Sequence, residues 1–434
     1  MRLLSTRIPM TSRPCNGQGP GRRLPLLALT LAASGALLLA PLASAQTDAT
    51  ATTLTLKQAT EAAWLRHPEA RGADARRDAA QAQRDVAASW IAEPLAVELS
   101  AKSDRLNRDN GNREYVAGVA IPLWLPGQRA HSQAVAEAER GAVDSRLSAA
   151  QWRVAGSVRE AWWAVHRSRQ DVTLAKARLA NAEQLATDVA RRTKAGDLSR
   201  ADQHQADGAM AGAQAALAEA VAAEATAMQA LRSVTGPVPN GRLAETPEAI
   251  PAETAADPSH PVLRELGDRA ELARRTRELA GTQSRANPEL NLATTRERGI
   301  SGVPYDQSIT VGVRIPFGSD GRSRAKVASA AADQIEAEQL LGIERERLAA
   351  EIDAARARVA SAALVVAAAD RRAALAHESR GFFEKSFRLG ETDLPTRLRV
   401  DLEAVEAERQ SARARIDQAL ALSQLRQALG LLPE

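Results

Sequence analysis

This chain contains an internal repeat of one structural unit. The passage Gly118-Val119-Ala120-Ile121-Pro122-Leu123 recurs as Gly312-Val313-Arg314-Ile315-Pro316-Phe317, at a spacing of 194 residues (312 minus 118). The pairs that keep this spacing to within one residue are Gly127 and Gly321, Gly196 and Gly390, and His67 and His260. A register held over so much of the sequence predicts a fold made of two equivalent halves.

Each half shows the same order of elements: helix, strand, strand, helix, helix. In the first half, Leu56 to about Ile91 predicts a helix that follows a Thr55 N-cap and stops before Pro94. Alternating apolar residues then predict two strands joined by a polar turn. Proline-free helices follow, from about Ala130 to Arg192 and from Ser323 to Arg388. Each would be on the order of 95 Å long.

The chain therefore divides into four predicted segments. Residues 1–45 form a signal peptide, and residues 46–236 form the first repeat, with strands at about 94–106 and 112–123. Residues 237–258 form a Pro- and Ala-rich linker. Residues 259–434 form the second repeat, with strands at about 288–298 and 306–317.

The N-terminal segment indicates export from the cytoplasm. Residues Met1 to Arg23 carry five arginines and no acid, Leu24 to Leu42 are largely apolar, and Ala43-Ser44-Ala45 follows as an A-x-A cleavage site. A retained anchor is the less favoured alternative, because Pro25 and Pro41 bracket a short run. The net charge of +4 includes these five arginines. The mature chain is then close to neutral, which gives no support for nucleic-acid binding.

The fold class that these patterns predict is mainly α with a β-barrel portion. Aromatic residues make up only 3% of the chain, and the Ala-, Arg-, Glu- and Leu-rich composition is typical of long coiled-coil helices. The four strands have the length that crosses a bilayer when tilted, with apolar faces opposite small or polar ones. Four strands cannot close a barrel, and eight would have a filled interior. We therefore expect a homotrimer with twelve strands, embedded in outer-membrane lipid.

The duplicated order resembles the TolC family of outer-membrane efflux proteins over essentially the whole mature chain. The passages that carry the resemblance are "GVAIPLWLPGQR" with "GVRIPFGSDGRSR", and "AGDLSRADQHQA" with "LGETDLPTRLRVDLEA". The resemblance implies an exit duct in the outer membrane with a periplasmic tunnel of twelve helices. Its implied partners are a periplasmic adaptor protein and an inner-membrane pump of the RND type. The IPL and IPF junctions look most like the heavy-metal (Czc/Cus-like) branch.

Several groups of residues follow as candidate sites. The resemblance implies a periplasmic tip for adaptor docking, formed by Gly196, Asp197, Leu198, Gly390, Glu391 and Thr392. The strand-to-helix junctions are expected at Pro122, Gly127, Pro316 and Gly321. Trp90 and Trp124 flank the first strand pair, so they are either membrane-interface aromatics or core residues at the helix junction.

A gate is the second site that the resemblance implies. Asp202 stands where the family has a gate aspartate that bonds across to the second half, although Ser199-x-x-Asp202 also fits a helix cap. Phe387 and Thr392 replace the family's Tyr and Arg, and Arg388 is the alternative source of positive charge. Thr396 and Arg399 stand at the family's constricting aspartates, which puts an acidic constriction in doubt.

No chemistry-bearing motif accompanies these sites. The six histidines are scattered without ligand spacing, and no nucleotide-binding or catalytic pattern occurs. We therefore expect no enzyme activity, no cofactor and no metal site. Two alternatives stay open: a soluble periplasmic coiled-coil scaffold or adaptor, and a type I secretion duct of the same family.

Overall fold

The computed structural model describes residues 53–107, 109–237, 242–252, 259–318 and 320–434. The predicted signal peptide and the outer parts of the predicted linker lie outside these residues. The elements of the first half are α1 (Leu56–Arg66), α2 (Pro68–Arg71), α3 (Ala73–Ala88), β1 (Ala96–Ser103), β2 (Arg113–Pro122), α4 (Gln128–Ala195) and α5 (Arg200–Thr235). Those of the second half are α6 (Pro261–Thr282), β3 (Glu289–Arg298), β4 (Asp306–Arg314), α7 (Asp320–Arg388) and α8 (Leu394–Ala428).

The expected single opening helix is wrong, because it is broken into α1, α2 and α3. Thr55 does cap its start, in a capping box with Gln58. At His67 the backbone is extended, since the following Pro68 disfavours the helical conformation. Gly72 separates α2 from α3, and α3 ends at Ala88, short of the expected Ile91. The second half repeats the histidine signal: His260 caps α6, with Pro261 in its first turn.

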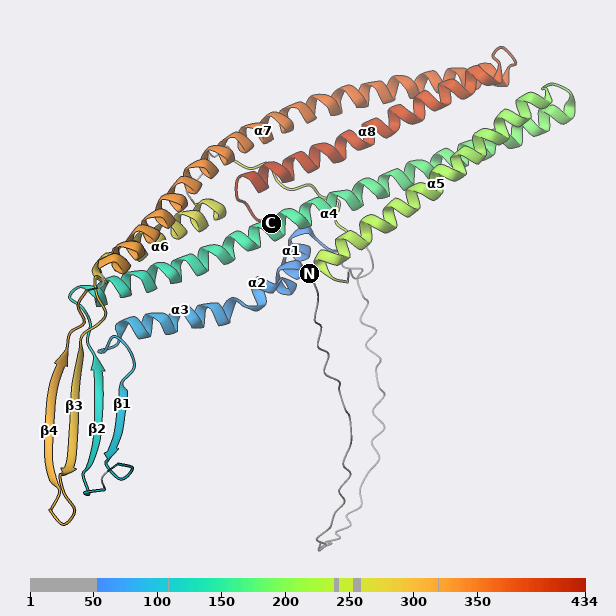
Figure 1. Ribbon diagram of the computed structural model, residues 1–434. Helices are drawn as coiled ribbons and strands as arrows, with labels where there is room; N and C mark the ends of the chain where they lie inside the picture. The colour runs from blue at the N-terminus through green and yellow to red at the C-terminus, as the bar shows by residue number, and fades with distance from the viewer. Residues whose placement is uncertain (1–52, 108, 238–241, 253–258, 319) are drawn as a thin grey trace, which may run out of the picture. The chain divides into compact units, whose positions relative to one another are not determined.

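The four strands form one antiparallel sheet in the order β1-β2-β3-β4. In the first hairpin Leu99 pairs with Ala117, and in the second Leu292 pairs with Val311. Leu99 is therefore the repeat equivalent of Leu292, because Ala117 and Val311 are 194 residues apart. The halves join where β2 pairs with β3, so β1 and β4 are the sheet edges (Figure 1).

The long helices pack through apolar residues spaced four and three apart along each helix. In α7, Leu348, Ile352 and Ala355 are buried and join a cluster with Leu263 of α6 and Leu425 of α8. Residues at this spacing lie on one face of a helix and so meet the neighbouring helices. In Figure 1 the sheet lies at one end of α4 and α7, and the turns of the α4–α5 and α7–α8 hairpins lie at the other. No helix in the described part of the chain combines the length and apolarity needed to cross a bilayer.

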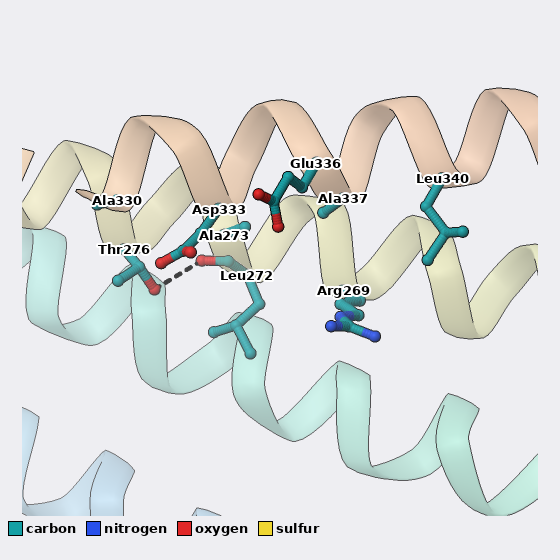
Figure 2. Close-up of a pocket in the computed structure, with 9 residues that line it drawn as sticks. All are labelled: Arg269, Leu272, Ala273, Thr276, Ala330, Asp333, Glu336, Ala337 and Leu340. Carbon is teal, nitrogen blue, oxygen red and sulfur yellow. Dashed lines mark hydrogen bonds between the residues drawn. The ribbon is translucent and has the colours of Figure 1, made fainter. Parts of the chain in front are cut away.

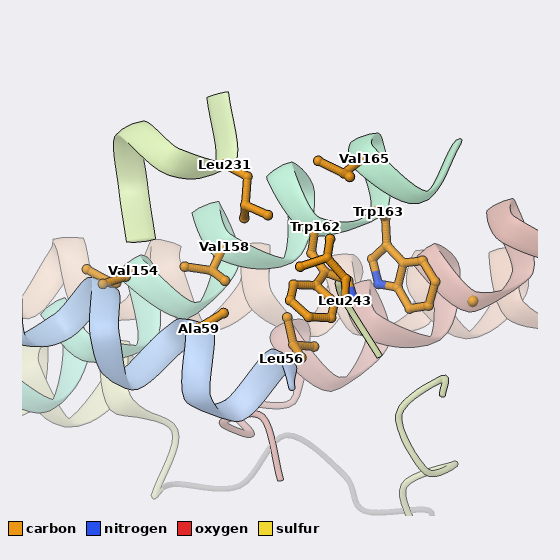
Figure 3. Packing of buried hydrophobic residues seen from close by; sticks show 11 residues of the cluster. Leu56, Ala59, Val154, Val158, Trp162, Trp163, Val165, Leu231 and Leu243 are labelled. Atoms are coloured by element: carbon orange, nitrogen blue, oxygen red, sulfur yellow. The ribbon is translucent and has the colours of Figure 1, made fainter. Parts of the chain in front are cut away.

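The largest buried cluster lies midway along α4. Figure 3 shows Trp162 and Trp163 of α4 meeting Leu56 of α1, Leu231 of α5 and Leu243 of the linker. Trp163 donates its indole N–H to the Ser423 hydroxyl of α8 at 2.8 Å, which satisfies a buried polar group. This cluster therefore joins α1, both helical hairpins and the linker.

A buried group of charges holds the described part of the linker. Arg159 of α4 donates two hydrogen bonds to the Glu248 carboxylate, at 2.7 and 3.0 Å. Arg426 of α8 lies 3.3 Å from the same carboxylate and donates to the Ala249 carbonyl. The three side chains are nearly inaccessible, so the Glu248 carboxylate is a shared counter-ion that offsets the burial of two guanidiniums. Arg426 also pairs with the exposed Glu434 at 2.8 Å.

Candidate functional site

Two turns of the same construction end the helical hairpins. At Gly196 the backbone φ is +90°, and the Asp197 N–H donates to the Arg192 carbonyl at 2.9 Å. At Gly390 φ is +78°, and the Glu391 N–H donates to the Ser386 carbonyl at 3.0 Å. Both are Schellman motifs, in which glycine supplies the left-handed residue that ends a helix.

A buried apolar cluster joins the two hairpins just behind these turns. Phe387 of α7 is wholly buried among Leu185 and Val189 of α4, Ala206 of α5 and Leu394 of α8. We call this group, with Leu198, Met210 and Leu398 packed against it, the tip cluster. The cluster holds the first hairpin against the second.

Two arginines cover the Phe387 ring from different hairpins. The guanidinium of Arg192, on α4, lies 4.8 Å from the ring centroid, and that of Arg397, on α8, lies 4.9 Å from it. Arg192 also donates to the Phe387 carbonyl at 3.1 Å. A guanidinium over an aromatic face is attracted by about 0.5–2 kcal/mol. Phe387 is therefore fixed by both packing and charge.

A cavity of about 520 Å³ lies beside the tip cluster, between α4, α5, α7 and α8. Four arginines and three acids line it: Arg178, Arg380, Arg388, Arg397, Asp188, Glu384 and Asp401. Burial raises the pKa of Asp401, and Glu384 adds to this, whereas Arg397 and Arg380 oppose it. Separation of the hairpins would expose this carboxylate.

Asp202 completes a capping box at the start of α5, where Ser199 is the N-cap residue. Its carboxylate accepts hydrogen bonds from the Ser199 backbone N–H at 3.0 Å and the Ser199 hydroxyl at 2.7 Å. The Asp202 N–H donates back to the Ser199 hydroxyl at 3.2 Å, which completes a capping box. The hydrogen bonds found for this side chain thus stay within its own turn, and a gate contact remains a prediction.

The other predicted tip and gate residues differ in whether they contact the tip cluster. Leu198 packs on the tip cluster, and Thr392 shares a 2.6 Å hydrogen bond with Ser386. Arg388 is exposed and lines the cavity, but it is Arg192 and Arg397 that cover Phe387. The remaining four lie around the turns without joining the cluster: Asp197, Glu391, Thr396 and Arg399.

The junction residues differ between the halves. Pro122 ends β2, and Gly127 starts α4 with φ +78°. After β4 and Pro316 the left-handed residue is Gly318, with φ +85°. Gly321 instead lies in the first turn of α7, which starts at Asp320.

The two tryptophans have different environments. Trp90 is 90% exposed, whereas the half-buried Trp124 donates its indole N–H to the Ser89 carbonyl at 3.1 Å. Trp124 therefore ties the strand-to-helix junction to the end of α3.

Three residues of the tip site were missed from the sequence: Arg192, Arg397 and Asp401. Charged residues are common in helices of this composition, and which of them face inward depends on how α4 meets α7 and α8. Among the described residues, no three His, Cys, Asp or Glu side chains are grouped as a metal site requires.

We compared the chain with known protein families and with curated proteins. Residues 59–237 match the family model "Outer membrane efflux protein". A search of curated proteins found no match.

Solved structures share the fold over most of the chain. One is the outer membrane protein VceC of Vibrio cholerae, with 18% identity, a TM-score of 0.71, and coverage of 87% of this chain and 97% of that one. The open-state MtrE outer membrane channel of Neisseria gonorrhoeae has 18% identity and a TM-score of 0.71, over 87% and 89% of the two chains. CusC, from a study of transmembrane channel formation, has 16% identity and a TM-score of 0.73, over 87% and 92%.

Proposed function

Residues 59–237 are an outer membrane efflux protein domain and the described chain has the fold of outer membrane efflux channels, so we propose that this protein is the passive exit duct of a tripartite efflux system. The observation that carries the proposal is the sheet. Its strands expose large apolar side chains, among them Val97, Leu99, Ile309 and Val311. A sheet with two free edges and such a face needs further strands and an apolar solvent.

Assembly as a homotrimer meets both needs. Three copies would supply twelve strands, the smallest closed set with an open lumen, and would place the apolar side chains in outer-membrane lipid. The helices would continue as a periplasmic tunnel. The soluble scaffold alternative leaves the exposed apolar strand residues without a role.

The tip is the proposed docking end. The turns at Gly196 and Gly390 lie at the end of the molecule farthest from the sheet, where a periplasmic adaptor and an RND-type inner-membrane pump would meet it. The tip cluster and the cavity beside it, formed from both hairpins, would open when the hairpins separate. The pump would supply energy and select the cargo.

We further propose heavy-metal cations as the cargo. The support is the likeness of the IPL and IPF junctions, at Pro122 and Pro316, to the heavy-metal branch of the family. Deleting the gene should then lower tolerance to metal salts more than tolerance to drugs. A larger loss of tolerance to drugs than to metal salts would contradict metal cations as the cargo but would not contradict the proposed duct.

One fractionation experiment tests the duct. Detergent-solubilised outer membranes should yield the protein as a trimer that runs as a heat-modifiable band and falls to a monomer on boiling. Recovery from the soluble periplasm without detergent, or a stable monomer in mild detergent, would contradict the proposal.

A further inference from the structure

The two faces of the four-stranded sheet differ in charge. Residues paired across antiparallel strands share a face, as do residues two apart along one strand. One face, which we call the apolar face, carries rows of apolar side chains, and one such row is formed by Val97, Val119, Leu292 and Val311. The opposite face mixes both signs of charge and carries Glu98, Lys102, Glu114, Glu289, Glu297, Asp306 and Arg314.

The charged residues that the apolar face carries within the described strands are three arginines at one end. Tyr115 pairs with Arg296, and two residues further along the strands Arg113 pairs with Arg298. Both pairs lie beside the β1–β2 and β3–β4 turns, at the end of the sheet away from the helices (Figure 1). No acid shares this face within the described strands, so the charge at its turn end is entirely positive.

Tyr305, in the β3–β4 turn, orients two of these arginines. The guanidinium carbon of Arg296 lies 4.8 Å from the ring centroid of Tyr305, and that of Arg298 lies 4.9 Å from it. The ring of Tyr115 is 6.4 Å from the same ring, measured between centroids. We call Arg113, Tyr115, Arg296, Arg298 and Tyr305 the turn-end cluster. Stacking through the flat face of a guanidinium leaves its in-plane N–H donors available to an anion.

The arginines of the turn-end cluster have no carboxylate partner among the described residues. The ion pairs that involve the described strands are Lys102 with Glu114 and Arg314 with Glu289, both on the opposite face. The three guanidiniums therefore keep their charge unneutralised within the chain.

The hydrogen-bond donors of the cluster are only partly used. The Arg298 Nε–H donates to the Gly111 carbonyl at 3.1 Å, which leaves its terminal N–H groups. The Arg113 Nε atom is buried and has no hydrogen-bond partner among the described residues. The acid of the adjoining turn, Asp104, accepts from the Asn110 N–H at 2.9 Å. A buried donor is unfavourable unless an acceptor meets it, so the cluster is short of acceptors.

Two hollows elsewhere in the molecule mix their charges instead. The groove between α6 and α7, of about 350 Å³, is lined by Arg269 together with Asp333 and Glu336 (Figure 2). The cavity beside the tip cluster has four arginines and three acids. Acids that line the same hollow offset the attraction of its arginines for an anion. The turn-end cluster is therefore better suited to bind one.

The depth of the cluster fits the headgroup level of a membrane. In the proposed outer-membrane duct, on which this inference rests, the apolar face lies in lipid and the turns face outside the cell. Arg298 lies eight residues from Leu290 along β3 (298 minus 290), about 27 Å of strand. At a strand tilt of about 40° this is about 20 Å across the membrane, most of an apolar band of about 25 Å. Tyrosine rings favour the same interfacial level.

We propose that the turn-end cluster binds the phosphate groups of a phosphorylated glycolipid in the outer leaflet, whose acyl chains lie along the apolar rows of the same face. Arginine suits this role, because its planar fork donates two parallel hydrogen bonds to phosphate oxygens. The lipid phosphates would also supply the acceptor that the buried Arg113 Nε lacks.

Native mass spectrometry of the full-length protein tests the site. The protein, purified from outer membranes in mild detergent and washed free of lipid, is titrated with diphosphorylated lipid A and with the same lipid after removal of its phosphates. The wild type should prefer the phosphorylated form by about tenfold or more, as charge-assisted hydrogen bonds predict. Arg296→Gln with Arg298→Gln should lose most of this preference at an unchanged trimer mass. Lys102→Gln removes a cation at a similar level on the opposite face, so it is the matched control and should keep the preference.

The outcomes separate the lipid site from the duct. Equal affinity of an intact wild-type trimer for the two lipids, or an unchanged preference in the arginine variant, would overturn the site and leave the proposed duct standing. Displacement of the lipid by an equal concentration of inorganic phosphate would assign the cluster to free phosphate and contradict a lipid site. Recovery of the wild type as a monomer outside the membrane would overturn the duct itself.

A second variant covers the case in which the glutamine variant does not assemble. Arg296→Lys with Arg298→Lys keeps both charges but loses the bidentate fork and the stacking geometry. It should assemble and show a smaller preference for the phosphorylated lipid than the wild type. An undiminished preference would contradict phosphate binding by these guanidiniums.

Discussion

At the scale of single residues, the tip is held by side chains with separable roles. Phe387 packs in the apolar tip cluster, and the guanidiniums of Arg192 and Arg397 lie over its ring. Asp202 completes a helix capping box with Ser199. The cap and the gate hypotheses for Asp202 differ in what its removal changes. Only a gate contact alters the width of the pore.

We expect Asp202→Ala to destabilise the tip by about 1 kcal/mol, the typical loss for a removed helix cap. Single-channel conductance should stay unchanged, because the capping bonds close on Ser199 within the same turn. Measuring the melting temperature and the single-channel conductance on one preparation of the variant distinguishes the cap hypothesis from the gate hypothesis. A larger conductance with intact assembly would instead establish Asp202 as a gate residue.

Asp401 gives the tip a predicted pH dependence. Burial raises the pKa of this carboxyl in the folded protein above the ordinary 3.8. The folded state then binds more protons than the unfolded state between the two pKa values. This contribution to stability is full below the unfolded pKa and is lost as pH rises through the folded pKa.

Asp401→Asn should remove that contribution. Hydrogen exchange of tip amides, compared between wild type and variant, should show the wild type losing protection relative to the variant as pH rises above about 4. Asp207→Asn, at an exposed position on α5, is the control and should keep the wild-type profile. Parallel pH profiles for wild type and Asp401→Asn would contradict the prediction.

At the scale of elements, the two hairpin turns depend on glycine for conformation rather than for space. A Cβ at Gly196 or Gly390 would meet nothing within 4 Å. Both have φ near +80 to +90°, where a side chain costs on the order of 1–2 kcal/mol. The strain would therefore stay local to each turn.

Gly196→Val and Gly390→Val should distort the tip and abolish export while leaving membrane insertion and trimer mass unchanged, because the sheet is about 100 Å away along the 68 residues of α4. Gly141→Val is the matched control: it lies inside α4, has equally open space and has no positive φ. Export by the tip variants at the control level would remove these turns from the docking site.

At the scale of the whole molecule, one buried carboxylate connects α4, the linker and α8. The Arg159 and Arg426 side chains are each 3% exposed and that of Glu248 is 7% exposed. Loss of the carboxylate would leave the buried Arg159 guanidinium without its counter-ion, and Arg426 with only the exposed Glu434 carboxylate, 2.8 Å away.

Glu248→Gln should therefore lower the free energy of unfolding by about 3–5 kcal/mol. Glu403→Gln removes one partner of the exposed Arg399–Glu403 pair and should cost about 1 kcal/mol or less. Denaturant melts of the two variants give the comparison. Similar small losses would show that the buried group does not hold the linker.

The sequence by itself determined what depends on local and periodic signals. The strand alternation and the glycines at both hairpin turns act within a few residues of the chain, and the 194-residue repeat can be read directly from the sequence. The structure contains all three. The break in the opening helix was missed although its signal is also local, because Pro68 disfavours the helical conformation at His67.

Only the tertiary structure decided which side chains meet across helices. Arg192, Arg397 and Asp401 converge on the tip because α4, α7 and α8 pack there, and Arg159 meets Glu248 because the linker crosses α4. Nothing in their local spacing sets them apart from the many other charged residues of these helices. Arg192 and Phe387 are 195 residues apart and Arg159 and Glu248 are 89 residues apart, so only packing gives these charges their low-dielectric surroundings and their roles.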